Sequence, residues 1–207
     1  MKLSESQRQS LASATQTYAD MMPGSPAEEY LAGRGIDAVV AGTFHLGYVA
    51  EPEVGHEQYA GRLAIPYLTP TGPVDIRFRS LGGDGPKYLT RPGATGHLFN
   101  VCAFQDDAEV IGLTEGELDA VVATGLAGIP SVGVPGANAW KSWYARAFHD
   151  YKRVLLLADG DSAGRDWAGR IAKELEQAVV ISMPDGMDVN EFVLSEGADA
   201  LRKRVGL

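Results

Sequence analysis

The chain has 207 residues, 45% of them hydrophobic, which is enough for one large domain or two small ones with an ordinary buried core. Its formal net charge of −9 excludes a histone-like mode of coating nucleic acid, because affinity for polyphosphate comes largely from Lys and Arg. No segment has the apolar length of a signal peptide or a membrane span, so we expect a cytoplasmic protein with no membrane partner. The single cysteine, Cys102, and four scattered histidines lack the spacing of zinc ligands, so we expect no zinc.

The first part of the chain carries three signals for the start of a helix. Ser4 and Gln7 have capping-box spacing and lead into a helix that we expect to end before Pro23. The segment 25–28 has a serine cap, a proline at the first helical position and a glutamate that can return to the cap amide. Asp37 is placed to cap a third helix.

An alternating pattern replaces the helical one further along. Residues 63–68 and 74–79 flank a turn rich in Pro and Gly, which predicts a β-hairpin. Because side chains alternate along a strand, Arg77 and Arg79 should share one face of the second strand with Asp75.

Positive charge gathers in and after this hairpin. Between positions 60 and 100, five basic residues stand against Asp75 and Asp84, which leaves a local charge of +3 in an acidic chain. We predict that this segment holds nucleic-acid or nucleotide phosphates, with a tyrosine as a stacking face for a base. The alternative is a solvated hairpin face with a packed tyrosine. The residues concerned are Arg62, Arg77, Arg79, Lys87, Tyr88 and Arg91.

The second half alternates short apolar runs with helical segments. Strands are expected near 110–113, 131–134, 154–158 and 179–183, and helices near 118–124, 140–148 and 163–175. This order predicts an α/β fold with a parallel sheet covered on both faces, in which sites collect beyond the carboxyl ends of the strands.

Acidic residues follow three of these strands. Glu115 comes directly after the first strand, and Asp159 and Asp161 follow the third, so the sheet can bring all three to one edge. Crowded carboxylates repel each other, and a hard divalent cation such as Mg²⁺ compensates them through oxygen ligands. The segment after the last strand can add Asp188 and, as support, Asn190 or Glu191.

Two other interpretations of these acids stay open. Acids after strands are often helix N-caps, as Asp188 could be. A phosphatase with an aspartyl nucleophile also carries an Asp-x-Asp pair, but such a pair is expected after the first strand of its domain, whereas Asp159 and Asp161 follow the third.

The acidic motifs resemble the Toprim domain shared by DnaG-type primases, topoisomerases and related nucleases. The motifs are Glu115-Gly116-Glu117-Leu118-Asp119, Asp159-Gly160-Asp161-Ser162-Ala163-Gly164-Arg165 and Pro184-Asp185-Gly186-Met187-Asp188. The primase branch fits best, although Asn190 departs from the aspartate of many cellular primases and is similar to some phage primase-helicases. Segments 30–36, 44–48 and 61–66 are similar to the start of the primase polymerase domain, so the resemblance covers roughly residues 26–195.

This resemblance implies a domain plan. It implies an N-terminal helix over 1–25, a primase-type α+β subdomain with the basic hairpin over 26–108, and a Toprim domain over 109–207. A zinc-binding module and a helicase-binding bundle are not expected, so template recognition and helicase coupling would come from a separate zinc-module or helicase protein or be absent. The compact size favours a phage-encoded protein.

The resemblance also implies an activity: Mg²⁺-dependent synthesis of RNA primers from ribonucleoside triphosphates on single-stranded DNA, with Mn²⁺ as a substitute. Asp159, Asp161 and Asp188 would hold the metal, while Glu115 would share it or assist deprotonation of the attacking 3′-hydroxyl; Asp119 is a candidate for structural support. The alternatives are a Toprim nuclease with the same metal cluster, and a catalytically weak module that binds single-stranded DNA or a replisome partner.

Overall fold

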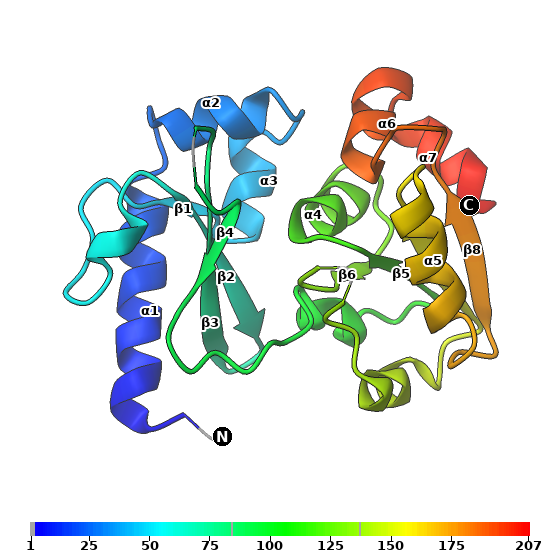
Figure 1. The fold of residues 1–207 in the computed structure, drawn as a ribbon, viewed down its shortest axis with the longest axis horizontal. Helices are drawn as coiled ribbons and strands as arrows, with labels where there is room; N and C mark the ends of the chain where they lie inside the picture. Colours follow the sequence, from blue (N-terminus) through cyan, green and yellow to red (C-terminus); the bar gives the residue numbers. More distant parts are fainter. Residues whose placement is uncertain (1–2, 84, 137) are drawn as a thin grey trace. The chain divides into compact units, whose positions relative to one another are not determined.

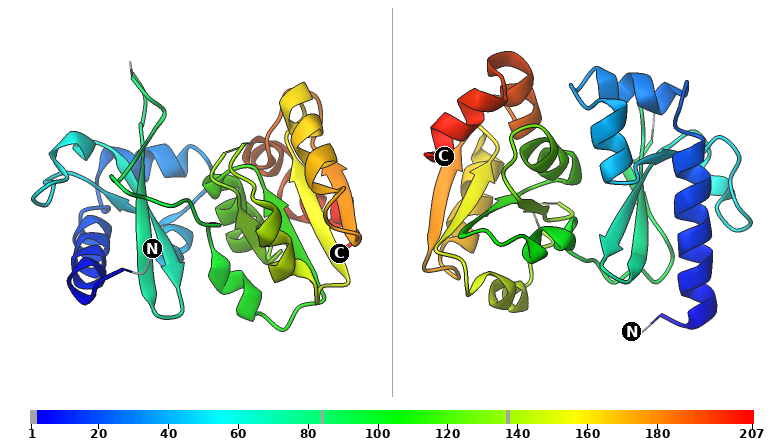
Figure 2. Two further views of the ribbon diagram at one scale, coloured as in Figure 1. Left: turned by 60° about the horizontal axis from the view of Figure 1, so that its bottom comes forward. Right: turned by 180° about the vertical axis from the view of Figure 1, so that it is seen from behind.

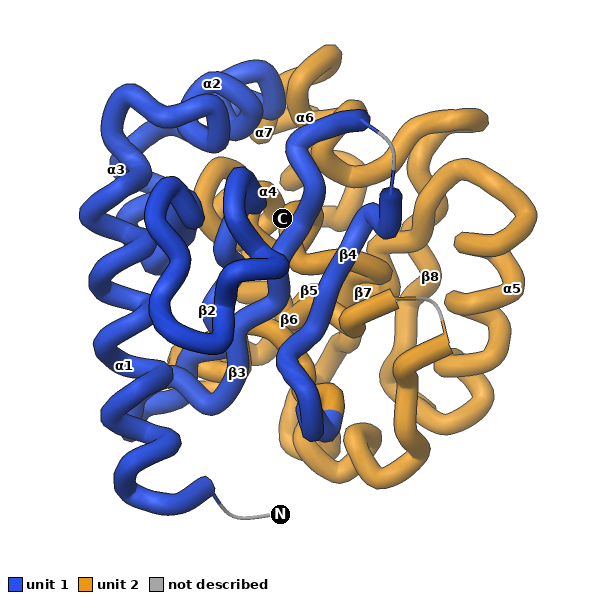
Figure 3. Tube along the Cα trace, turned by 60° about the vertical axis from the view of Figure 1, so that its left-hand side comes forward, with its two compact units in different colours: residues 1–95 blue, residues 96–207 orange. Residues whose placement is uncertain are grey.

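The computed structural model describes residues 3–83, 85–136 and 138–207, which form two compact units (Figures 1 and 3). The first unit extends to Thr95 and the second begins at Gly96. The second unit therefore begins before the predicted boundary at residue 109, because Leu98 and Ala103 are part of its hydrophobic core. Asp84, which the local charge of the hairpin region includes, lies outside the described residues.

Three helices open the first unit, and each has the predicted cap. They are α1 (Glu5–Asp20), α2 (Pro26–Ala32) and α3 (Ala38–Thr43). The capping box at Ser4 is formed, and Asp37 caps α3. Ser25 caps α2, but Glu28 accepts its hydrogen bond from the Gly24 amide at 2.6 Å and not from the amide of the cap residue.

An antiparallel sheet forms the rest of this unit. Its strands are β1 (Gly47–Tyr48), β2 (Leu63–Thr69), β3 (Gly72–Arg79) and β4 (Tyr88–Thr90), in the order β1-β2-β3-β4, with the 3₁₀ turn η1 (Glu57–Tyr59) before β2. The predicted hairpin is therefore confirmed as β2 and β3. Helix α1 lies along the sheet (Figure 2) and buries Leu11, Ala14 and Tyr18 against Ile76 and Phe78. The first helix thus forms part of the core.

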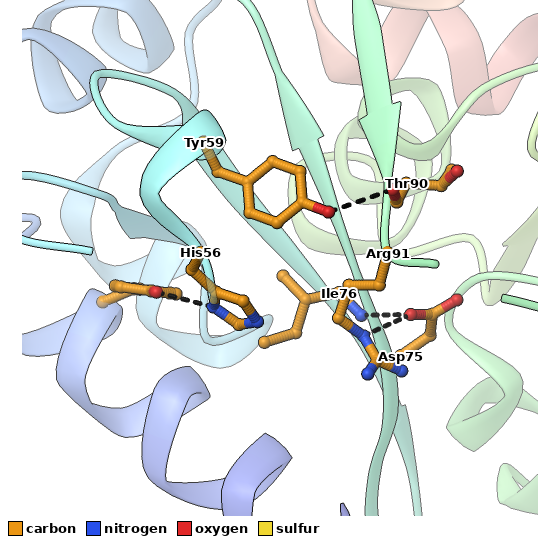
Figure 4. Close-up of polar contacts among 7 residues, drawn as sticks. His56, Tyr59, Asp75, Ile76, Thr90 and Arg91 are labelled. Carbon is orange, nitrogen blue, oxygen red and sulfur yellow. Dashed lines mark hydrogen bonds and ion pairs between the residues drawn. The ribbon is translucent and has the colours of Figure 1, made fainter. Parts of the chain in front are cut away.

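Polar contacts join β3 to the segment around β4 (Figure 4). Asp75 is 6% exposed, and its Oδ1 accepts a hydrogen bond from Arg91 Nε at 2.9 Å. Tyr59 donates to the Thr90 carbonyl oxygen at 3.1 Å. The carboxylate on this face of the hairpin is therefore buried and paired.

The second unit contains a parallel sheet. Its elements are η2 (Val101–Gln105), β5 (Val110–Thr114), α4 (Glu117–Gly125), β6 (Ser131–Gly133), η3 (Ser142–Phe148), β7 (Arg153–Ala158), α5 (Ser162–Ile171), β8 (Ala178–Ser182), α6 (Val189–Glu196) and α7 (Ala198–Val205). The strand order is β6-β5-β7-β8, and all pairs are parallel, as predicted.

Some details of the second unit differ from expectation. The segment expected as a helix over 140–148 forms the 3₁₀ helix η3, and α5 ends at Ile171 instead of residue 175. The edge strand β8 leaves Val179 and Val180 at 38% and 46% exposure, so cover on both faces holds for the inner strands only. No helix of the described residues is long and apolar enough to cross a bilayer.

We expect Arg91→Ala to lower the free energy of unfolding by about 2 kcal/mol, because it leaves the buried Asp75 carboxylate without its cation. The measurement is urea denaturation. The control is the double variant Asp75→Ala/Arg91→Ala, which should recover part of the loss. A double variant no more stable than Arg91→Ala would show that the two side chains are not coupled.

Candidate functional site

Glu115 and Asp159 lie together at the carboxyl edge of the parallel sheet. They follow the neighbouring strands β5 and β7, whose register pairs Thr114 with Leu157. Glu115 Oε1 accepts a hydrogen bond from the Asp159 backbone N–H at 3.1 Å. Two acids 44 positions apart therefore meet at this edge, as the parallel strand order predicts.

Close backbone packing at two glycines makes this meeting possible. A Cβ on Gly164 would lie 2.8 Å from Glu115 Oε1 and 2.3 Å from the Asp159 carbonyl oxygen. A Cβ on Gly160 would lie 1.8 Å from the Pro184 carbonyl oxygen. The glycine between the two aspartates therefore leaves room for the loop after β8.

The same packing brings Asp188 towards the edge. The Gly160 amide donates to the Met187 carbonyl oxygen at 2.8 Å, and the Gly186 amide donates to the Gly160 carbonyl oxygen at 3.0 Å. These bonds fix the loop after β8 beside the loop after β7, so the third predicted acidic segment joins the first two.

Asp161 and Asp188 are helix caps as well as members of the acidic cluster. Asp161 Oδ1 accepts from the Gly164 amide at 2.7 Å at the start of α5. Asp188 Oδ1 accepts from the Glu191 backbone N–H at 2.7 Å, and the Glu191 carboxylate accepts from the Asp188 backbone N–H at 3.0 Å. The N-cap interpretation is thus correct for both, and each cap uses one of the two carboxylate oxygens.

Asp159 carries the strongest electrostatic perturbation of the cluster. Burial, together with the negative charges of Glu115, Asp188, Asp161 and Glu191, raises its pKa to about 7 from an ordinary 3.8. Burial also raises the pKa of Glu115. Within the described residues, Asp159 Oδ1 is buried without a hydrogen-bond partner. An unsatisfied carboxylate oxygen among other carboxylates is costly unless a cation compensates it.

The donor set fits a hard divalent cation in its chemistry. Oxygen ligands and crowded negative charge are what Mg²⁺ requires. In the part of the chain that the structure describes, no three acidic, cysteine or histidine side chains already converge as a ligand set. Asp161 and Asp188 turn one oxygen each to a helix amide, so coordination would use their second oxygens or a change of rotamer.

Asp119 and Asn190 connect the helices behind the cluster. Asp119 Oδ1 accepts a hydrogen bond from the backbone N–H of Asn190 at 3.2 Å, and this bond connects α4 to α6. Asn190 is only 2% exposed. These contacts support the structural role expected for Asp119. Glu117, two residues earlier in α4, is 1% exposed, a burial that no pattern in the sequence indicates.

The basic residues of the first unit are largely engaged within the protein. Arg79 is 8% exposed, and its guanidinium donates to the hydroxyls of Tyr30 and Tyr88. The Arg77 guanidinium lies 4.2 Å from the centre of the Tyr88 ring. A face of the tyrosine expected to stack on a base is therefore covered by an arginine, which agrees with the packed-tyrosine alternative.

Three other residues of the predicted basic surface differ in accessibility. Arg62 donates to the Pro86 carbonyl oxygen at 3.0 Å, and Arg91 pairs with Asp75. Lys87 is exposed. Binding of nucleic acid by this surface stays a prediction, and Lys87 is the residue most accessible for it.

Comparison with known proteins adds to this geometry. Residues 112–193 match the family described as Toprim-like. The chain is 44% identical over 152 residues to the Gene 57 protein of Mycobacterium phage D29, covering 71% of this chain and 99% of that protein. It is also 26% identical over 247 aligned positions to a DNA primase of Pseudomonas aeruginosa, covering 94% of this chain and 37% of the primase.

The chain belongs to the Toprim family, and it is similar to the catalytic core of DnaG-type primases. A solved DnaG primase catalytic domain bound to single-stranded DNA has the same fold, with a TM-score of 0.80 at 23% identity over 98% of this chain and 80% of that one. The predicted family and fold class are therefore confirmed. The chain spans only about a third of the length of that bacterial primase.

We expect Gly160→Ala to destabilise the second unit and to disorganise the acidic cluster, because the new methyl group overlaps a backbone oxygen that has no room to move. A loss of roughly 2–3 kcal/mol should be measurable by denaturant unfolding. The control is Gly42→Ala in helix α3, where an added Cβ meets nothing within 4 Å. Equal stability of the two variants would contradict the close approach.

We expect Asp159→Asn to be more stable than the wild type at pH 8 in EDTA. The folded protein binds the Asp159 proton more tightly than the unfolded chain, so stability falls as pH rises from 3.8 to about 7 and stays lower above it. With solvent screening at this half-buried group, the gain is about 1–2 kcal/mol, or a few degrees in Tm.

The same comparison at pH 5 and with added Mg²⁺ completes the test. At pH 5 the folded carboxyl is protonated while that of the unfolded chain is largely ionised, so the gap between the two proteins should be smaller than at pH 8 and should close only below the ordinary pKa of 3.8. Added Mg²⁺ should raise the Tm of the wild type at pH 8 and have little effect on Asp159→Asn. A variant that melts below the wild type at pH 8 would show that Asp159 is not under electrostatic strain.

Proposed function

We propose that the chain is a primase catalytic core that joins ribonucleotides on a single-stranded DNA template in a reaction dependent on Mg²⁺. The observation that carries the proposal is the buried, unsatisfied oxygen of Asp159 among Glu115, Asp161 and Asp188 at the carboxyl edge of a Toprim sheet. The primase names of its relatives support the choice of reaction.

Four carboxylates would hold the metal: Asp159, Asp161, Asp188 and Glu115. The chemistry that such a cation supplies is neutralisation of phosphate charge and stabilisation of the leaving pyrophosphate. Mn²⁺ would serve as a substitute, because its oxygen-ligand preference is similar.

The chain's own residues position the reaction. The Asp159 amide holds the Glu115 carboxylate in one orientation, which places Glu115 to share a metal or to accept the proton of an attacking 3′-hydroxyl. The caps at Asp161 and Asp188 fix the ends of α5 and α6, so these carboxylates approach the edge from rigid elements. In the first unit, the exposed Lys87 would contact template or triphosphate.

We expect the purified protein to make short RNA from labelled ribonucleoside triphosphates on single-stranded DNA with Mg²⁺ or Mn²⁺. Asp159→Ala should reduce synthesis by at least about 100-fold, because it removes a central metal ligand. The matched control is Asp199→Ala, an exposed acid of α7, which should retain full synthesis. Circular dichroism checks that both variants are folded.

Other results of this assay would assign the protein differently. Full synthesis by Asp159→Ala would remove the acidic cluster from the mechanism. Cleavage of the template without ribonucleotide incorporation would indicate a Toprim nuclease. Template binding without product at any metal concentration would indicate a non-catalytic DNA-binding module.

A further inference from the structure

The outer face of α5 forms an open basic groove that no part of the proposed metal chemistry uses. Its volume is about 580 Å³. Its main lining residues are Asn138, Arg165, Asp166, Gly169, Arg170 and Lys173, and we call it the α5 groove. Most of them lie three or four residues apart on α5 or just after it, so they share one side of the helix.

The charge of the α5 groove is opposite to that of the chain. Three basic residues face one acidic residue, Asp166, which leaves +2 at the groove against −9 for the whole sequence. Arg165 and Lys173 are exposed, and among the described residues neither has an ion-pair or hydrogen-bond partner for its side chain. Arg170 donates to Asn138 Oδ1 at 3.4 Å. Two cations are therefore available to an anionic ligand.

Gly169 lines the α5 groove without a side chain that would fill it. A glycine inside a helix makes the helix less stable than an alanine would, so a glycine at such a position usually allows close packing. Gly164, on the buried side of the same helix, has such a reason, since Glu115 and Asp159 occupy the space of its Cβ. Gly169 has none: a Cβ there would meet nothing within 4 Å. Its missing side chain instead leaves space in the groove.

The α5 groove begins beside the acidic cluster. Ala163, which also lines it, lies two residues after Asp161, at the first turn of α5. Arg170 lies close enough to Glu115 for its positive charge to offset a part of the rise that burial produces in the pKa of that carboxyl. From there α5 runs along β8 (Figure 1), so the groove extends away from the acidic edge.

We propose that the α5 groove binds the sugar-phosphate backbone of single-stranded DNA where the strand extends beyond the acidic cluster. The inference rests on the proposed function, which brings such a strand to this edge. Arg165 and Lys173 are eight residues apart, about 12 Å if the helical rise continues past the end of α5 at Ile171, which suits phosphates two nucleotides apart on an extended strand. None of the main lining residues is aromatic, so binding should depend on charge and show little base preference.

The test is binding of fluorescent oligothymidylate, measured by anisotropy in EDTA at several salt concentrations. Arg165→Ala and Lys173→Ala should each weaken binding about 3- to 10-fold and reduce the salt slope by about 0.7 per lost phosphate contact. Lys203→Ala, which removes an exposed cation of α7, is the control and should bind like the wild type.

A second variant separates binding from folding. Gly169→Gln should raise the thermal stability of the protein, because it replaces a helical glycine, yet weaken oligonucleotide binding several-fold by filling the groove. The control is Gly42→Gln in α3, where a Cβ also meets open space; it should bind unchanged.

The outcomes distinguish this inference from the proposed function. Wild-type affinity in Arg165→Ala, Lys173→Ala and Gly169→Gln would overturn the inference even if the protein makes primers. Loss of affinity for free ribonucleoside triphosphate alone, with oligonucleotide binding intact, would also overturn it. Weaker oligonucleotide binding in a protein that makes no primer would support the groove and contradict the proposed function.

Discussion

The crowding of carboxylates at one edge of the parallel sheet is the constraint on which the second unit depends. Glu115 lies against the Asp159 amide because Gly164 has no side chain, and the loop carrying Asp188 lies against Gly160 for the same reason. Burial and mutual repulsion then raise the pKa of Asp159 to about 7. The folded chain thus retains a carboxylate arrangement that opposes its own stability, as expected where a site is organised for a ligand.

Much of this arrangement could be predicted from the sequence, because its signals are local. Apolar runs between helices gave the parallel sheet, and its strand order brings Glu115 to Asp159. The serine and aspartate caps of the first helices were visible as spaced residue pairs. The capping role of Asp161 and Asp188 was less predictable, because caps and metal ligands use the same residue type and the backbone amide that each oxygen meets depends on the fold.

The basic residues were harder to interpret, because a charged side chain does not reveal its partner in the sequence. Arg79 and Arg91 looked like phosphate ligands, but they lie against tyrosine hydroxyls and the Asp75 carboxylate respectively. The spacing of Arg165 and Lys173 was equally present in the sequence. This spacing alone did not indicate a binding site, because a helix face with positive charges is usually only solvated. The open space at Gly169 appears only in the structure.

The acidic cluster with its cation and the α5 groove would together allow an acidic protein to bind a polyanion such as the proposed strand. Exposed charges act over about one Debye length, roughly 8–10 Å at physiological salt, so the net charge of −9 matters less than the charges beside the strand. At the carboxyl edge, a divalent cation would offset Asp159 and its neighbours. Along α5, Arg165 and Lys173 supply positive charge without a metal. A strand that passes from the carboxyl edge to the α5 groove would have its phosphate charge compensated at both places. A surface with the same net charge spread evenly would not offer this.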